Sequence, residues 1–363
     1  MKKIGRATMV FDHPPLILDS ASIVGPKEGE GPLGKYFDQV WEDPMLGKKT
    51  WEEAESELQT KAAQAVLEKA GIPSAKIDYL FAGDLLGQII ATSFGLASFH
   101  RPIFGLYGAC STMGEALILS AMCLDGGFAS KVLAVTSSHF ASAERQFRFP
   151  LEYGNQRPLS ATWTVTGSGA FIVSRAGSLA KDKGGSASGV KWENGCPRIT
   201  MATPGKIVDM GVKDSMNMGA CMAPAACDTI ETHFRDTHTK PEDYDAVITG
   251  DLGYVGHEIL VELMGKKGYD MGKVHLDCGI EIFDKDRQDT HSGGSGCGCS
   301  AVVLSAMILP RLMDGTWEKV LFVPTGALLS SISFNEGKSV PGIAHAVVLE
   351  QGQMRKGAAV FHL

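Results

Sequence analysis

The sequence EALILSAMCLDGGFASKVLAVTSS at residues 115–138 has a counterpart in SAVVLSAMILPRLMDGTWEKVLFVPTG at residues 300–326. Both contain Leu-Ser-Ala-Met, then a loop with glycine, then Lys-Val-Leu and an apolar run. The first part of each stretch is apolar nearly all round, which is typical of a buried helix. A second matching pair lies earlier in each half: IDYLFAGDLLG at 77–87 and YDAVITGDLGYVG at 244–256. Two matches in the same order predict a duplicated fold with two homologous halves.

The alternation of short apolar runs with helical stretches predicts an α/β fold. Thr50 and Glu53 form a capping box, apolar residues then recur at helical spacing, and Gly71 ends the pattern, so we expect a helix between them. Strands are expected at residues 77–82, 102–108, 131–137 and 170–174. The expected organisation is an N-terminal half with extended N-terminal loops at 1–175, a connecting segment at 176–213 and a C-terminal half at 214–363.

Composition excludes several classes of protein. The 363 residues are 44% hydrophobic and 21% charged, which excludes a disordered chain and a small disulfide scaffold. Lys and Arg number 34 against 41 for Asp and Glu, so the net charge of -7 argues against nucleic acid as a partner.

Cysteine usage and apolar runs indicate the compartment. Eight cysteines in a long chain, with no pattern of a secretory leader at its start, predict reduced thiols and no structural disulfides. The longest apolar stretch, residues 80–96, contains Asp84 and Gln88, so we expect no transmembrane helix and no signal peptide.

Cys110 is the first candidate for chemistry. It lies in LYGACSTMGEAL, residues 106–117, where an expected strand gives way to a buried helix. A thiol at a helix N-terminus has its thiolate form favoured by the helix dipole, so Cys110 is a candidate nucleophile. The alternative is that Cys110 is a small buried hydrophobic residue.

His291 is the second candidate, in THSGGSGCGCSA at residues 290–301. It precedes a Gly-rich loop that leads into the second buried helix, at the position that corresponds to Cys110 in the duplicate. We therefore expect His291 to face Cys110 across the pseudo-twofold axis, although a surface histidine is the alternative. The thiols of Cys297 and Cys299 lack the spacing of a zinc site, and no metal site is expected.

The chain resembles the thiolase and ketoacyl synthase superfamily in three features. These are the duplicated core, Cys110 at the turn from a strand into a buried helix, and His291 followed three residues later by Gly294. The resemblance implies a thiolase-like fold in which two α/β halves form a five-layered αβαβα core with central buried helices. Members of the superfamily pair through an edge strand and its flanking helices, so the resemblance also implies a homodimer.

Three stretches, residues 108–122, 147–170 and 203–226, more specifically resemble the stage V sporulation protein AD family of endospore-forming bacteria. That resemblance implies binding of dipicolinic acid, or its calcium chelate, during uptake into the developing spore and release in germination. It implies a soluble or peripheral protein at the spore inner membrane, working beside membrane proteins of the same sporulation operon. No cofactor is implied, apart from calcium that the ligand itself could carry.

The sequence departs from the condensing enzymes at one position. Where those enzymes carry their first catalytic histidine, the strand AVITG ends in Asp251, and the nearest histidine, His257, follows six residues later. An ionised carboxylate cannot donate to an oxyanion, and beside Cys110 it disfavours a thiolate. We therefore expect a relict site in which Cys110 and His291 no longer catalyse condensation. The alignment could slip so that His257 takes the position.

A dicarboxylate pocket needs cations or hydrogen-bond donors for two carboxylates and a flat apolar slot for the ring. Arginine suits carboxylates because its guanidinium binds them through two parallel hydrogen bonds. The expected ligand-binding residues are Cys110, Asp251, His291, Arg145, Arg148, Arg157 and Lys206. Asp84 and Asp251 could instead help to hold a calcium ion, although a strand-end cap is favoured for Asp84.

Two other functions stay open at this point. The first is an acyl-thioester transferase or condensing enzyme in which Cys110 is the nucleophile and His291 the base; it predicts covalent acylation of Cys110. The second is a structural adaptor with an empty pocket, whose partner interaction survives a Cys110→Ala substitution.

Overall fold

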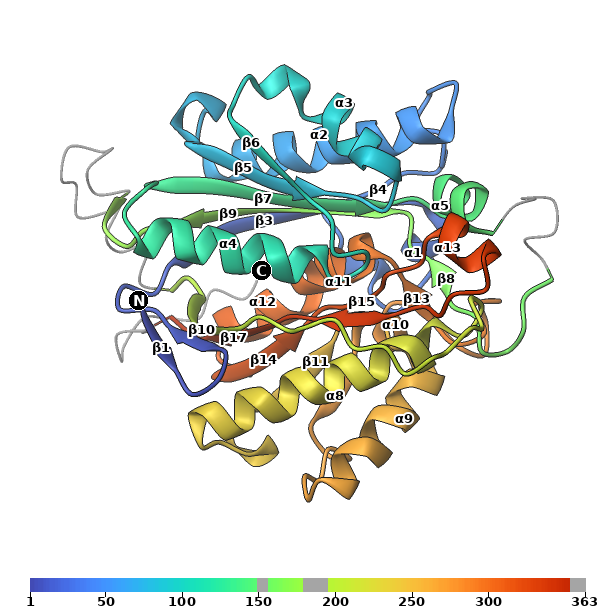
Figure 1. Cartoon of the computed structure of the whole chain (residues 1–363). Coiled ribbons are helices and arrows are strands. Elements are labelled where there is room, and N and C mark those ends of the chain that lie inside the picture. The colour runs from blue at the N-terminus through green and yellow to red at the C-terminus, as the bar shows by residue number, and fades with distance from the viewer. Residues whose placement is uncertain (149–155, 179–194, 353–363) are drawn as a thin grey trace.

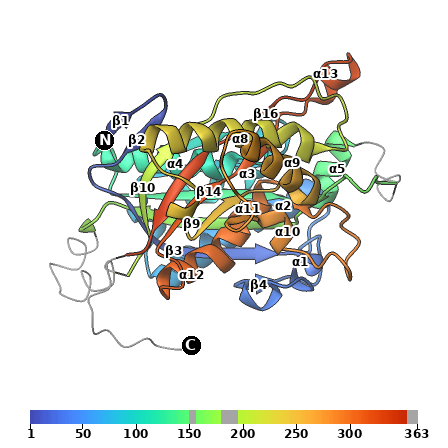
Figure 2. The same ribbon diagram turned by 90° about the horizontal axis from the view of Figure 1, so that it is seen from below.

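Two β-sheets alternate with three layers of helices in the computed structural model, which describes residues 1–148, 156–178 and 195–352 (Figure 1). Helices α2 (Trp51–Ala70) and α3 (Ile90–Gly95) cover the outer face of the first sheet. The central layer holds α4 (Thr112–Asp125) and α11 (Cys297–Val303). The outer face of the second sheet is covered by α8 (Met218–Thr237) and α9 (Gly253–Lys266), as Figure 2 also shows. The predicted five-layered α/β fold with central buried helices is confirmed.

Each sheet layer has a main run of five strands in the same topological order, and β1, β2 and β4 lie outside these two runs. The first runs β3 (Leu16–Val24), β9 (Gly167–Ser174), β7 (Lys131–Ser138), β5 (Tyr79–Gly83) and β6 (Ile103–Leu106). The second runs β10 (Arg198–Thr203), β17 (Ala346–Glu350), β14 (Lys319–Val323), β11 (Ala246–Thr249) and β12 (His275–Asp277). In both, two antiparallel pairings are followed by two parallel ones. The duplication inferred from sequence therefore extends to all five strands of each main run.

The expected connecting segment, 176–213, contains one of these strands. β10 pairs with β17 in the second sheet and touches β3 of the first through a single residue pair, Arg198 with Leu16. Residues 179–194 of that segment lie outside the described residues. The hairpin of β1 (Lys2–Ile4) and β2 (Thr8–Val10) adds to β10 from the N-terminus.

Helix α2 forms where the sequence places it. The Thr50 hydroxyl accepts from the Glu53 amide at 3.2 Å, and the Glu53 carboxylate accepts from the Thr50 amide, which satisfies the capping box. Gly71 ends the helix with φ 61°, a left-handed conformation that suits glycine. The buried face of α2, which includes Leu58 and Val66, packs on the first sheet.

The central helices form the main core of the molecule. The buried side chains of α4 and α11 pack between the inner faces of both sheets. The chain continues from α11 through a π-helical turn, Leu304–Ile308, into α12 (Leu309–Met313). Helix α11 approaches the first sheet closely, because a Cβ at Gly298 would lie 2.5 Å from the Gly167 carbonyl oxygen. The glycines of the SGGSGCGCS run therefore permit backbone contact between the halves.

The shorter elements connect these layers. They are α1 (Pro26–Gly29), β4 (Gln39–Val40), α5 (Phe140–Phe147), β8 (Trp163–Thr164), α10 (Cys278–Glu281), β13 (Gly294–Ser295), β15 (Thr325–Ala327), α13 (Ser331–Asn335), β16 (Gly342–Ala344) and the 3-10 turns Gly34–Tyr36, Ser74–Lys76, Gly87–Ile89, Ala97–Phe99 and Pro241–Asp243. β8 and β13 pair in parallel and so join the two halves just before the N-terminus of α11. Within the described ranges, every helix is too short or too polar to cross a bilayer. The eight cysteines, all of them in described parts of the chain, form no disulfide.

The close packing of α11 generates a prediction about stability. Gly298→Ala places a methyl group against the Gly167 carbonyl and the Ser138 hydroxyl, which lies 2.6 Å from the Cβ position. We expect a loss of about 1–3 kcal/mol in the free energy of unfolding, measured with urea, because overpacking forces the backbone apart. Gly265→Ala in α9 is the matched control, since nothing lies within 4 Å of its Cβ position. That control should gain about 0.5–1 kcal/mol from helix propensity alone. Equal effects of the two substitutions would contradict the packing argument.

Candidate functional site

Cys110 lies in the loop that links β6 to α4, two residues before the helix begins. Ala109 takes φ 50°, and the Thr112 hydroxyl both accepts from the Gly108 amide and donates to the Ala109 carbonyl. Gly326 of β15 backs this loop, because a Cβ there would lie 2.4 Å from the Gly108 carbonyl oxygen. The position of the thiol is therefore fixed by backbone contacts from both halves.

Asp251 meets Cys110 at the end of β11. Its fully buried carboxylate interacts with the Cys110 thiol through a side-chain hydrogen bond. It also accepts from the Gly296 amide at 2.9 Å and from the Thr325 hydroxyl at 2.8 Å. Burial raises the pKa of Asp251 to about 7, although these hydrogen bonds oppose the shift.

The environment of Cys110 favours the neutral thiol. Burial raises the pKa of Cys110 well above its ordinary value, and the Asp251 carboxylate raises it further. The helix N-terminus alone indicated a lowered thiol pKa, and the structure gives the opposite result because desolvation and the nearby carboxylate dominate. The site therefore holds a protonated thiol near neutral pH.

His257, the alternative at the position of the missing histidine, lies elsewhere. It is part of α9, and its Nδ1 atom lies 2.7 Å from Nδ1 of His275. His275 in turn lies 2.9 Å from the Thr249 hydroxyl. Asp251, and not His257, is the residue that the second half presents to Cys110.

A small cavity of about 30 Å³ adjoins Cys110. Its walls are mainly apolar, with a few polar groups, and its lining residues are Leu85, Tyr107, Ala109, Cys110, Ala143, Phe147, Arg148, Thr164, Met218, Ser295, Ala327 and Leu329. That volume is the space of about one water molecule. A small-molecule ligand can enter only if the side chains of this cavity move apart.

The basic candidates separate into one residue at the cavity and three outside it. Arg148 lines the cavity and pairs with Glu144. Arg145 is exposed and pairs with Glu52. The remaining two make contacts elsewhere: Arg157 with Asp289 at 3.0 Å and Lys206 with Asp228 at 2.8 Å. Of these four candidates, Arg148 is the one that lines the cavity at Cys110.

His291 does not line the cavity. Its Nε2 atom lies 2.9 Å from the Asp289 carboxylate, and its Nδ1 atom lies 2.9 Å from the Pro158 carbonyl oxygen. The expectation that His291 faces Cys110 is therefore wrong. The loop turns after His291, which has φ 52°, so that Ser295 reaches the cavity four residues later.

Two hydroxyl groups of the cavity had no signal in the sequence. Thr164 and Ser295 line it from β8 and β13, where they are paired across the two strands. Strands of two residues show no periodicity, and serine and threonine are common in turns, so only the fold identifies these donors. Tyr107 also lines the cavity. It lies three residues before Cys110 in the motif LYGACSTMGEAL, and this closeness in sequence was the available signal for it.

The buried acids near Cys110 are satisfied by protein donors. Asp84 accepts from the Leu86 amide and from the amide and hydroxyl of Thr92, which is the strand-end cap favoured from sequence. Glu55 accepts from two serine hydroxyls, and burial raises its pKa to about 8. Among the residues described here, no group of three His, Cys, Asp or Glu side chains is arranged to hold a metal ion.

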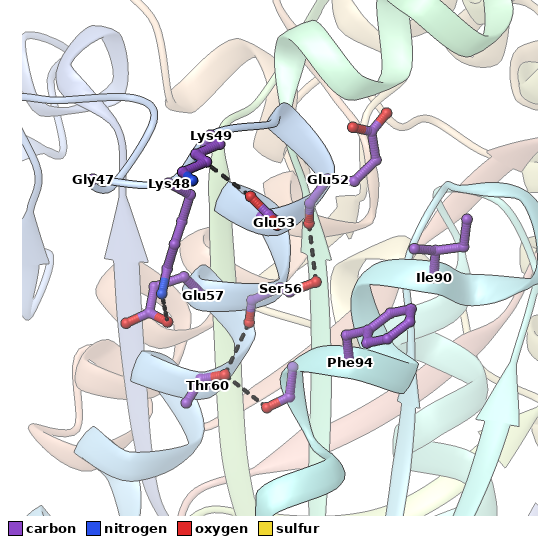
Figure 3. A pocket seen from close by; sticks show the side chains of 11 residues that line it. Gly47, Lys48, Lys49, Glu52, Glu53, Ser56, Glu57, Thr60, Ile90 and Phe94 are labelled. Atoms are coloured by element: carbon purple, nitrogen blue, oxygen red, sulfur yellow. Dashed lines mark hydrogen bonds and ion pairs between the residues drawn. The ribbon is translucent and has the colours of Figure 1, made fainter.

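A larger cavity, of about 660 Å³, lies at the surface between α2 and α3 (Figure 3). Two of its charged groups form an ion pair on the α2 side, where Lys48 Nζ lies 3.0 Å from Glu57 Oε2. The Thr60 hydroxyl donates to the Gly95 carbonyl, while Phe94 and Ile90 lie at its edge. It contains no thiol, histidine or buried cation, so we assign the candidate site to the smaller cavity at Cys110.

Comparison with known sequences places the chain in one family. The family model of stage V sporulation protein AD matches residues 5–350. Stage V sporulation protein AD of Bacillus subtilis (strain 168) is 42% identical over 351 residues, which cover 97% of this chain and 98% of that protein.

Solved structures resemble the chain in fold. The 3-oxoacyl-[acyl-carrier-protein] synthase III of Aquifex aeolicus VF5 matches with a TM-score of 0.53 and 12% identity, covering 93% of this chain and 99% of that one. The tetronic acid condensing enzyme AbyA1 matches with a TM-score of 0.55 and 18% identity, covering 92% and 99%. Cerulenin-bound OleA of Xanthomonas campestri gives 0.54 and 16%, covering 93% and 98%. The fold is thus thiolase-like, as the resemblance implied.

The buried Asp251 carboxylate generates a prediction about pH dependence. Its pKa rises from 3.8 when unfolded to about 7 when folded, so ionisation costs folding free energy progressively between these pH values. Asp251→Asn lacks this cost. Its free energy of unfolding should therefore rise relative to the native protein between pH 4 and 7, by roughly 4 kcal/mol at most, and then stay level.

Chemical denaturation at a series of pH values measures this difference. Asp209→Asn is the control, because hydrogen bonds from Ser339 and Gly211 lower the pKa of that exposed carboxyl. That variant should show no relative gain between pH 5 and 8. A pH-independent difference for the Asp251 variant would contradict the assignment.

Proposed function

The chain belongs to the stage V sporulation protein AD family, and from this role in sporulation we propose that it binds dipicolinic acid, alone or as its calcium chelate, at Cys110. The binding serves uptake of the ligand into the developing spore and its release in germination. One observation carries the proposal: Arg148, whose side chain is only 9% exposed, lines an otherwise largely apolar cavity that a protonated thiol adjoins.

The groups around the cavity suit a flat aromatic dicarboxylate. Leu85, Phe147 and Met218 supply apolar surface for the ring. The guanidinium of Arg148 supplies the paired donors that a carboxylate prefers. The hydroxyls of Thr164 and Ser295 are available donors for the second carboxylate. Apolar walls with a few converging polar groups are typical of small-molecule sites.

Ligand entry requires the cavity to expand from its volume of about 30 Å³. Sites for small molecules usually enclose about 300–1,000 Å³. Phe147 is the last residue of α5, Met218 is the first residue of α8, and Leu329 follows β15. Rotation of these three side chains therefore widens the cavity without moving the sheets. In the proposal, the ligand selects this open arrangement.

The state of Cys110 supports binding over catalysis. An acyl-thioester transferase needs a thiolate at Cys110 and a base beside it. Here the pKa of the thiol is raised, Asp251 is its neighbour, and His291 contacts Asp289 and Pro158. The proposal therefore treats the protein as non-catalytic, with the acyl-thioester enzyme as the alternative.

Further parts of the proposal concern partners. Passage of dipicolinate across the spore inner membrane is assigned to membrane proteins of the same operon, which receive the ligand from this peripheral protein. Any calcium arrives chelated by the ligand, because Asp84 and Asp251 already accept hydrogen bonds from the protein.

The homodimer is part of the proposal and is supported by the edge strand β6. β6 pairs with β5 on one side and ends the sheet on the other. Ile103, Phe104 and Tyr107 are 44%, 51% and 46% exposed there, which is a large apolar surface for an open edge. Pairing with β6 of a second copy about a twofold axis covers both the backbone groups and these side chains.

Calorimetric titration of the purified protein with dipicolinate, with and without calcium, tests the binding site. We expect saturable binding that is at least tenfold tighter than for benzoate, the monocarboxylate control, since a second carboxylate adds charge-assisted hydrogen bonds worth about 1.5–3 kcal/mol each. Arg148→Gln should weaken the binding by roughly tenfold or more. Arg145→Gln and Lys206→Gln should not change it, because both cations pair with acids away from the cavity.

Other outcomes separate the alternatives. Binding that Lys206→Gln weakens as much as Arg148→Gln would move the site away from Cys110. No heat with any ligand would contradict the carrier function in the isolated protein and favour the adaptor. Acylation of Cys110 by an acyl thioester, detected by mass spectrometry, would favour the enzyme.

The dimer is tested by a charged residue on β6. Phe104→Lys places an ammonium group in the proposed interface, so we expect the native protein to behave as a dimer and the variant as a monomer in light scattering. Phe128→Lys is the control, because Phe128 is 76% exposed in the loop after α4. A native monomer, or a variant that stays dimeric, would contradict the β6 interface.

A further inference from the structure

Arg148 has an incomplete set of hydrogen bonds for a buried guanidinium. Its side chain is 9% exposed, and its Nε atom is buried without a hydrogen-bond partner. Its Nη1 atom donates a weak hydrogen bond to Sδ of Met216, at 4.0 Å. An unsatisfied donor of a charged group inside a protein is costly, so its presence beside a cavity indicates an acceptor that arrives from outside.

Among the described residues, the carboxylate that pairs with Arg148 is Glu144, one helical turn earlier in α5. The Glu144 side chain is 1% exposed. Burying a carboxylate is unfavourable unless a cation compensates it, and Arg148 supplies the nearest such cation. Glu144 thus gives the empty cavity a zero net charge at the arginine.

We propose that Glu144 is an internal placeholder on Arg148, and that the carboxylate of an incoming anionic ligand takes over the guanidinium when the cavity fills. This inference rests on the proposed anion-binding role of the cavity, but not on dipicolinate as the ligand. Glu144 determines the affinity of the site by competing with the ligand. It keeps the empty site closed to solvent and makes binding reversible.

The neighbouring pair on the same helix provides a contrast. Arg145 and Glu52 also form an ion pair, but their side chains are 47% and 24% exposed. Water can replace either partner there, so loss of Glu52 has little effect on Arg145. In the buried pair, loss of Glu144 leaves Arg148 with only an incoming anion as a full partner.

The test compares two alkylating reagents that differ in charge. Iodoacetate carries a carboxylate and iodoacetamide is its neutral analogue, and both react with the same thiolate of Cys110. The ratio of their rates, read from the Cys110 peptide by mass spectrometry at pH 9, cancels the pKa of the thiol. It reports whether the cavity attracts a carboxylate.

We expect Glu144→Gln to raise the ratio of iodoacetate to iodoacetamide rates by roughly tenfold, because the released guanidinium makes a charge-assisted hydrogen bond to the reagent. Arg148→Gln should lower the ratio below that of the native protein. Glu52→Gln is the matched control and should leave it unchanged. Glu144→Ala replaces the amide variant if that variant loses the native circular dichroism spectrum.

The double variant separates a specific effect of Arg148 from general charge. In an Arg148→Gln background, Glu144→Gln should no longer raise the ratio. An equal rise in that background overturns the placeholder role, and so does the absence of any alkylation of Cys110. If the ratio behaves as expected but dipicolinate gives no heat, the placeholder stands and the proposed ligand is wrong.

Discussion

The close approach of backbone segments around Cys110 is the constraint on which the site depends. The elbow before α4, the end of β11, the loop before α11 and β15 meet where Gly326 and Gly298 leave no room for a Cβ. This contact ties the two halves together along the pseudo-twofold axis. At Cys110 it also leaves little room for a cavity, because backbone atoms of the two halves approach each other there.

The same constraint accounts for the electrostatics. The Asp251 carboxyl group lies where the two halves meet and is removed from water, so its pKa rises to about 7. The protein compensates with hydroxyl and amide donors from both halves, such as Thr325 and Gly296 for Asp251. Because these donors belong to the core, the floor of the site is rigid, and adaptation to a ligand is left to the rim.

The sequence predicted the parts of this structure that follow from local pattern or repetition. The duplicated strands, the capped helix at Thr50 and the positions of Cys110 and Asp251 follow from apolar periodicity and from two strand-end matches. His291 was placed wrongly because a glycine-rich loop sets no direction for its side chains. The sequence could not distinguish Arg148 from Arg145. The two residues are only three positions apart, yet the side chain of Arg145 is exposed and that of Arg148 is largely covered. Thr164 and Ser295 gave no pattern at all.

The fold is that of condensing enzymes, and under the proposed function the chemistry of a few positions lets this fold hold a ligand without reacting with it. The carboxylate of Asp251 stands where condensing enzymes are expected to carry an imidazole. It favours the protonated thiol of Cys110, which can donate a hydrogen bond, over the thiolate. The arginine at the rim then becomes the main charge in the cavity, and Glu144 balances it when the cavity is empty. Because a neutral thiol and a shielded cation bind an anion weakly and do not attack it, the arrangement favours exchange of the ligand over its retention. That property is what a carrier requires and what a covalent catalyst cannot use.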